Sequence, residues 1–122
     1  MRPSFRKRGY SPEWDALAVS YKQQNLWCIS CWGAGVRRRI EIVDHIVPVI
    51  DAPERLLDLT NLQGACRWCH ATLKVQLEAR WRAGKIKIED LDLRSDVAHA
   101  LRRKLQPPPL IGADGYPVSE AV

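Results

Sequence analysis

The 122-residue sequence lacks any stretch that approaches the roughly 18 apolar residues of a membrane-spanning helix. Its basic N-terminus also lacks the apolar region of a secretory signal peptide. From these two absences we expect an intracellular protein, in a reducing compartment and without a membrane partner. Cysteines in such a compartment bind metal more often than they pair as disulfides. This expectation bears directly on the four cysteines of the chain.

Acidic residues are outnumbered by basic ones, and the formal net charge is +5. Much of the excess is clustered in residues 2–8, in Arg37, Arg38 and Arg39, and in residues 102–104. Such clusters favour a polyanionic partner such as nucleic acid, although ordinary solvated charge explains many sequences of this balance. The charge alone therefore decides little. The mid-chain arginines are candidate contacts to a DNA backbone.

The length fits one small domain. Residues 1–10 are predicted to be a flexible basic arm, and residues 11–105 a single domain with its core motif at 28–82. Residues 106–122 are rich in proline and glycine without periodicity, which predicts a disordered tail. Because so small a domain buries a modest share of its surface, a bound metal would support a thin core.

Three segments carry clear secondary-structure patterns. Ser11 precedes a proline and an acid, as at a helix start, and Trp14 begins an apolar face that we expect in the core. Residues 40–47 are rich in β-branched side chains and predict a strand that ends at Pro48. We expect this strand to pair with the segment before it in a short hairpin. Ser95 is a candidate cap for a last amphipathic helix.

Residues 69–82 have the periodicity of a helix. Leu73, Leu77 and Trp81 recur every four residues and form one apolar stripe. Extending the stripe back by one turn reaches His70. The helix face that packs on the hairpin is therefore predicted to turn His70 toward it.

Two Cys-x-x-Cys turns are the strongest metal-binding signal in the chain. Each turn brings two thiolates together, and two such turns complete the tetrahedral shell of a structural zinc ion. Redox pairs or disulfides are the alternatives. The distance between the turns exceeds the usual window, which implies an inserted substructure, and Asp44 and His45 lie in that insert. The four predicted zinc ligands are Cys28, Cys31, Cys66 and Cys69.

Residues 66–70 also have the form of a c-type haem attachment sequence. This interpretation requires export and leaves Cys28 and Cys31 without a role. The sole methionine that could serve as a second axial ligand is Met1. A haem protein is therefore disfavoured.

The order and spacing of the remaining polar residues are distinctive. After the first Cys-x-x-Cys turn the chain reads VDHIVP at residues 43–48, then Asn61-Leu-Gln, then the second turn followed at once by His70. From residue 28 to about residue 75 this run resembles the HNH endonuclease family, in particular its small zinc-bearing phage and prophage members. The resemblance implies a small α+β fold: a ββα-metal unit with a zinc site, flanked by helices, with flexible termini.

The resemblance also implies roles for four residues. Asp44 and His70 would be the protein ligands of one catalytic divalent metal, such as magnesium or manganese. His45 would be the general base, and Asn61 would orient it and brace its loop. These roles suit phosphodiester hydrolysis, which needs an activated water and charge stabilisation at the phosphate. An imidazole titrates near neutrality, and a metal acts as Lewis acid and template.

Each of these residues has a plainer interpretation. Asp44 and His45 could be an ordinary surface pair, His70 a helix-end residue or a fifth candidate zinc ligand, and Asn61 a turn cap. Adjacent strand residues also point to opposite faces, so the strand is expected to bend or end near His45. Some relatives place a third histidine ligand where this chain has Lys74. A lysine cannot bind a cation but could contact a phosphate, which makes Lys74 a candidate DNA contact.

The sequence therefore predicts a metal-dependent DNA endonuclease. The resemblance adds a phage origin, the bacterial host cytoplasm as location, and phage terminase or packaging proteins as partners besides DNA; no oligomeric state is predicted. The alternative is a non-catalytic zinc-finger protein that binds DNA or assists phage packaging, for which basic residues would suffice. The complete set of Asp44, His45, Asn61 and His70 favours the nuclease, since a binding protein does not need it.

Overall fold

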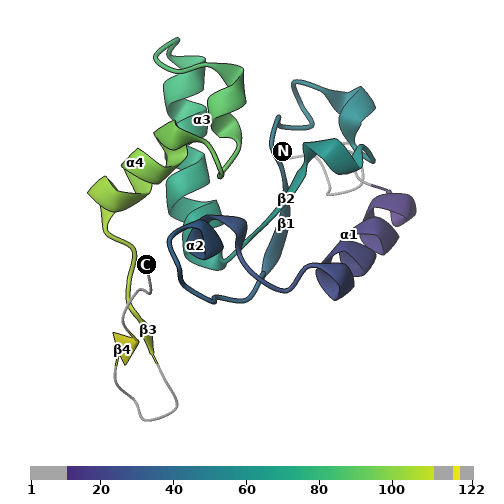
Figure 1. Ribbon diagram of the computed structural model, residues 1–122. Coiled ribbons are helices and arrows are strands. Elements are labelled where there is room, and N and C mark those ends of the chain that lie inside the picture. Colours follow the sequence, from purple (N-terminus) through teal and green to yellow (C-terminus); the bar gives the residue numbers. More distant parts are fainter. Residues whose placement is uncertain (1–10, 112–116, 119–122) are drawn as a thin grey trace, which may run out of the picture.

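The computed structural model describes residues 11–111 and 117–118 and has the small α+β fold that the sequence predicts (Figure 1). The predicted flexible arm, residues 1–10, lies outside the described residues. Within the predicted tail, two short strands pair with each other. The elements are α1 (Pro12–Gln24), α2 (Ile29–Gly33), β1 (Ile42–His45), η2 (Pro53–Arg55), η3 (Leu59–Asn61), β2 (Leu62–Ala65), η4 (Cys69–Lys74), α3 (Val75–Arg82), η5 (Ile88–Leu91), α4 (Asp96–Leu105), β3 (Leu110–Ile111) and β4 (Pro117–Val118).

The hairpin is formed by β1 and β2, with Asp44 opposite Gln63 in antiparallel register. The predicted pairing of β1 with the segment before it is wrong, because β1 pairs with a strand that follows it. All four residues of β2 are buried, and the side chain of Ile40 packs where a Cβ on Gly64 would be. The Leu-Gln-Gly-Ala sequence of β2 contains no β-branched residue, so its strand character comes from burial rather than propensity.

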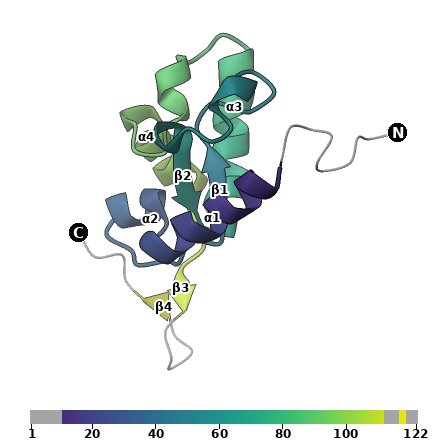
Figure 2. The same ribbon diagram turned by 90° about the vertical axis from the view of Figure 1, so that its right-hand side faces the viewer.

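Helices lie on both sides of the hairpin. In the two perpendicular views, α1 lies on one side and the continuous helix of η4 and α3 on the other (Figures 1 and 2). The Ser11 side chain accepts a hydrogen bond from the backbone of Trp14, which confirms the predicted cap of α1. Trp14 is buried, as expected of a core residue. None of the helices in the described ranges is long and apolar enough to cross a bilayer.

The helix predicted at residues 69–82 is confirmed, with one refinement. Its first six residues, η4, are π-helical, and α3 continues it as a regular α-helix. Such π-helical turns are rare and occur often at functional sites. Leu73 and Leu77 of the predicted stripe are fully buried, and Trp81 packs against the same cluster. The helix ends before Gly84, which has the positive φ of 73° that glycine adopts without strain.

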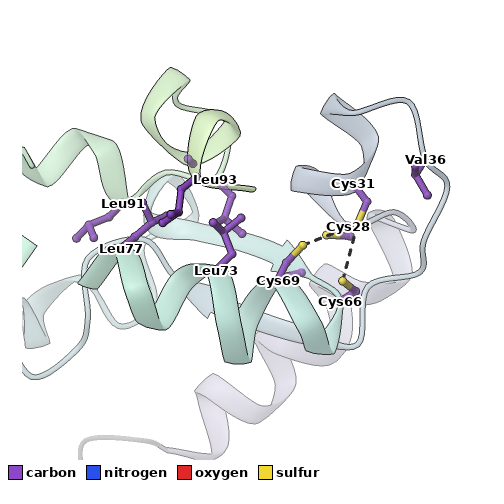
Figure 3. Close-up of a cluster of buried hydrophobic side chains, with 12 residues drawn as sticks. Cys28, Cys31, Val36, Cys66, Cys69, Leu73, Leu77, Leu91 and Leu93 are labelled. Carbon is purple, nitrogen blue, oxygen red and sulfur yellow. Dashed lines mark hydrogen bonds between the residues drawn. The ribbon is translucent and has the colours of Figure 1, made fainter. Parts of the chain in front are cut away.

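The hydrophobic core joins the cysteines to the second half of the chain (Figure 3). Leu91 and Leu93, in and after η5, pack on the leucines of the stripe, and α4 covers them. The Ser95 side chain accepts from the backbone of Ala98, which confirms the predicted cap of α4. The cysteine cluster is thus one end of a continuous core rather than a separate surface site.

Candidate metal centre and active site

The four cysteines converge in the core, and each is at most 1% exposed. Their sulfur atoms all lie within 4.8 Å of one another. The Cys31 sulfur is 3.9 Å from that of Cys66 and 3.8 Å from that of Cys69. Tetrahedral zinc with bonds of about 2.3 Å separates its sulfur ligands by about 3.8 Å. The quartet therefore has the dimensions of a structural zinc site, and the cysteines are free thiols rather than disulfides.

Local backbone geometry explains why the two turns converge. Cys28 precedes α2, and its carbonyl accepts a hydrogen bond from the backbone of Trp32. The carbonyl of Cys66 accepts in the same way from the backbone of His70, at the start of η4. Each Cys-x-x-Cys pair thus lies on the first turn of a helix, where short spacing brings both sulfur atoms to one side.

Crowding of the thiols affects their protonation. Hydrogen bonds with the thiols of Cys28, Cys31 and Cys69 lower the pKa of Cys66 well below its ordinary value. Hydrogen bonds with Cys28, Cys31 and Cys66 raise the pKa of Cys69. The pKa of Cys28 is also lowered, to about 7, first by its hydrogen bond with Cys31. The cluster thus favours thiolates at Cys28 and Cys66 and opposes further ones, because like charges in a buried site repel. A divalent cation would relieve that repulsion.

Two arginines reach the cluster from outside. Arg38 and Arg102 each donate to the Cys31 sulfur across 3.7 Å, and Arg102 is 2% exposed. Zinc bound by four thiolates carries a net charge of about −2, which two guanidinium groups offset. Arg38 also donates to the carbonyl of Pro108 at 2.9 Å. Of the three arginines predicted to contact DNA, Arg37 and Arg39 are exposed, whereas the Arg38 side chain lies against the cysteines.

A second polar cluster lies where β1 faces η4. Asp44 Oδ1 is 3.7 Å from His70 Nε2, and Asp44 Oδ2 is 3.1 Å from Lys74 Nζ. Gln63 of β2 donates to Asp44 Oδ2 at 3.4 Å. His70 therefore does face the hairpin, as the leucine stripe predicts. The Asp44 and His70 side chains are 15% and 38% exposed, so the pair is open on one side.

Lys74 is placed differently from the predicted phosphate contact. Its side chain is 1% exposed, and its ammonium faces Asp44, Glu78 and the His45 carbonyl instead of solvent. Glu78 and Gln63 have no predicted role. The i, i+4 spacing from Lys74 is a signal that could have indicated Glu78. The sequence signal that could have indicated Gln63 is its position in the Asn61-Leu-Gln run.

His45 is buried between α1 and the loop that follows β1, with 4% of the residue exposed. Its ring centroid is 4.4 Å from that of Trp14, and its Nε2 is 2.9 Å from the carbonyl oxygen of Leu56. A carbonyl oxygen only accepts hydrogen bonds, so Nε2 carries the hydrogen and the neutral ring has its lone pair on Nδ1. Asp44 and His45 thus point to opposite sides of β1, which ends at His45.

Asn61 holds the chain immediately after His45. The side chain is fully buried, donates to the Val47 carbonyl at 3.0 Å and accepts from the Val47 backbone N–H at 2.9 Å. Its own carbonyl accepts from the backbone of Ile46 at 2.8 Å. These bonds close the loop between β1 and η3. The Asn61 side chain therefore fixes the loop backbone at Val47.

Comparison with protein-family models matches residues 28–76 to HNH endonucleases. This segment matches an HNH endonuclease domain. The match contains both cysteine pairs together with Asp44, His45, Asn61 and His70. Comparisons with curated proteins and with solved structures found no match. Members of the HNH family are in general nucleases that act on DNA and use divalent metals.

The donor set of the HNH domain fits two kinds of metal. A search of the described residues for three or more metal-binding side chains close together finds the four cysteines. Asp44 and His70 offer two atoms 3.7 Å apart, close to the roughly 3 Å between neighbouring ligands of a metal with bonds near 2.1 Å. Two protein ligands leave coordination positions for water and substrate, as catalytic sites require.

Proposed function

We propose that this protein is a metal-dependent endonuclease that hydrolyses phosphodiester bonds in DNA. The observation that carries the proposal is the pair of Asp44 and His70. Asp44 Oδ1 and His70 Nε2 lie 3.7 Å apart and are partly open to solvent, and Asp44 is next to His45 in the sequence. The HNH domain supports it, since the family is in general made of nucleases. A phage origin, a role beside terminase and a location in the host cytoplasm stay predictions from the resemblance.

Asp44 Oδ1 and His70 Nε2 are the atoms that would hold one divalent metal, such as magnesium or manganese. When bound, this metal would supply Lewis-acid stabilisation of negative charge on the phosphate and the leaving oxygen. The two ligands come from different elements, β1 and η4, so packing of the helix on the hairpin sets their separation. Oxygen and nitrogen ligands suit several divalent metals, whereas the thiolates favour zinc.

His45 would act as the general base and take a proton from water through Nδ1. The Leu56 carbonyl fixes the required tautomer, because it holds the hydrogen on Nε2. The Trp14 ring packs against the imidazole and limits how it can turn. Asn61 would keep the base in place through the loop backbone, since it fixes Val47, two residues after His45.

Arg37 and Arg39 are the exposed members of the arginine run and would contact DNA phosphates. Such contacts are sequence-independent and weaken steeply with salt, because binding releases counterions from the duplex. Arg38 would contribute to the cysteine centre instead, since its guanidinium is within 3.7 Å of Cys31.

A second function is favoured by a specific observation. The Lys74 ammonium already lies 3.1 Å from Asp44, so a cation is present on a proposed metal ligand. If that ion pair excluded metal, the protein would be a non-catalytic zinc-finger protein that binds DNA or assists phage packaging, with the cysteine centre alone supporting its fold. Binding without cleavage would then be the result in every divalent metal.

The two functions are separated by a plasmid assay. We expect zinc-loaded protein to nick supercoiled plasmid with magnesium or manganese, and His45→Ala to lose at least 100-fold in rate, as expected for removal of a general base. His99→Ala is the matched control, because His99 lies on α4 outside the proposed site, and it should retain activity. Full activity in His45→Ala would rule out the assigned base. DNA binding without nicking by the wild type would support the alternative.

A further inference from the structure

Lys74 is a buried cation inside the proposed active site. Its ammonium lies 2.9 Å from the carbonyl oxygen of His45, 3.1 Å from Asp44 Oδ2 and 3.2 Å from Glu78 Oε2. An ammonium has three N–H donors, so three acceptors satisfy it completely. With 1% of its side chain exposed, Lys74 cannot reach a phosphate on bound DNA. Its role must therefore act through the groups that it touches.

The partners of Asp44 are divided between its two oxygens. Oδ2 accepts from Lys74 and from Gln63, whereas Oδ1 faces His70. Gln63 is itself fixed, because it donates to the Leu91 carbonyl and accepts from the Leu93 backbone N–H. The carboxylate is thus held along one edge by two donors. The oxygen beside the imidazole is the one presented for a metal.

The charge of Lys74 has its own counter-ion. A lysine next to a metal ligand would repel a divalent cation if it were unpaired. Glu78, one helical turn later, lies within 3.2 Å of the ammonium and offsets that charge. The pair of Lys74 and Glu78 is neutral overall, so the negative charge of Asp44 stays available. The orientation of Asp44 by Lys74 therefore affects metal binding more than the repulsion between Lys74 and the metal does.

We propose that Lys74 is a positioning residue that fixes the Asp44 carboxylate so that Oδ1, with His70 Nε2, binds a divalent metal. This inference rests on the proposed metal role of Asp44 and His70. Groups that orient a metal ligand in this way typically contribute 10- to 100-fold in affinity, a rough range for such partners. The same ammonium bonds the His45 backbone, so Lys74 ties the η4 helix to both members of the Asp44–His45 pair.

The test is a titration of manganese into zinc-loaded protein, followed by calorimetry and by the electron paramagnetic resonance of the ion. We expect the wild type to bind one manganese ion and Lys74→Gln to bind it roughly 10- to 100-fold more weakly. The matched control is Arg82→Gln, which removes an ion pair between the same helix and Asp51 but lies outside the proposed site. Its affinity for manganese should equal that of the wild type.

Each outcome has a distinct meaning. Equal or tighter manganese binding by Lys74→Gln would overturn the positioning role. Binding would become tighter if Lys74 mainly repelled the metal, and would stay equal if Lys74 had no effect on it. Absence of manganese binding by the wild type would overturn the Asp44–His70 metal site itself. Zinc content and thermal unfolding check that the variants fold. If Lys74→Gln does not fold, the double variant Lys74→Met with Glu78→Gln leaves fewer unpaired buried charges, and the same loss of affinity is expected.

Discussion

The protein contains two polar centres of opposite design. The cysteine centre has four sulfur ligands, each at most 1% exposed, whereas the centre of Asp44 and His70 has two ligands on a partly open face. Closed four-ligand sites are typical of structural metals, and sites with vacant positions are typical of catalytic ones. The difference supports the proposal that one centre maintains the fold and that the other is available for chemistry.

Both centres nevertheless contain a buried cationic side chain. Arg102 donates to Cys31 at the first centre, and Lys74 lies on Asp44 at the second. In both cases a buried, positively charged side chain contacts one proposed metal ligand. The comparison suggests a common role, which is to orient and balance an anionic ligand rather than to replace a metal.

The two centres share one short helix segment, η4. η4 begins at Cys69 and ends at Lys74, with His70 directly after the last cysteine. Movement of the cysteines must therefore move His70 relative to β1.

The largest expected effect comes from breaking the cysteine centre. Removal of zinc with a chelator, or Cys66→Ser, should unfold the domain, because binding energy on the order of 10 kcal/mol is folding energy in small zinc domains. Circular dichroism during thermal unfolding, together with a zinc assay, measures this. An unchanged melting curve after zinc is lost would show that the cysteines do not support the fold.

A smaller effect is expected from the cation behind the cysteines. Arg102→Leu should weaken zinc retention by about tenfold, because it removes a buried donor to Cys31 while keeping an apolar side chain of moderate size. Competition with a chelator measures the change. Arg103→Leu is the matched control, since Arg103 is the exposed neighbour on α4. Equal zinc retention in the two variants would count against the role of Arg102.

Much of the site follows from local pattern. The matched Cys-x-x-Cys turns indicate the cysteine cluster, and the leucine stripe of residues 69–82 places His70 toward the hairpin. Caps at Ser11 and Ser95 could be predicted because each depends on residues three positions away. In each of these features the residues lie close together in the sequence, so their spacing determines their geometry.

The features that sequence analysis missed depend on distant parts of the chain. The partner of β1 is β2, a strand without β-branched residues whose four residues are all buried. The sequence predicts Lys74 as a phosphate contact, and only the approach of Asp44 from another element makes it part of a buried ion pair. Such contacts follow from tertiary packing, which local propensity does not encode.

The most direct measurement is plasmid nicking by zinc-loaded wild type and Asp44→Asn, with zinc content and manganese binding determined on the same samples. We expect Asp44→Asn to keep its zinc and its fold, to lose manganese binding, and to lose nicking at least 100-fold, because the two centres have separate ligands. Undiminished nicking by Asp44→Asn, or nicking by the wild type that needs no divalent metal beyond zinc, would contradict this expectation.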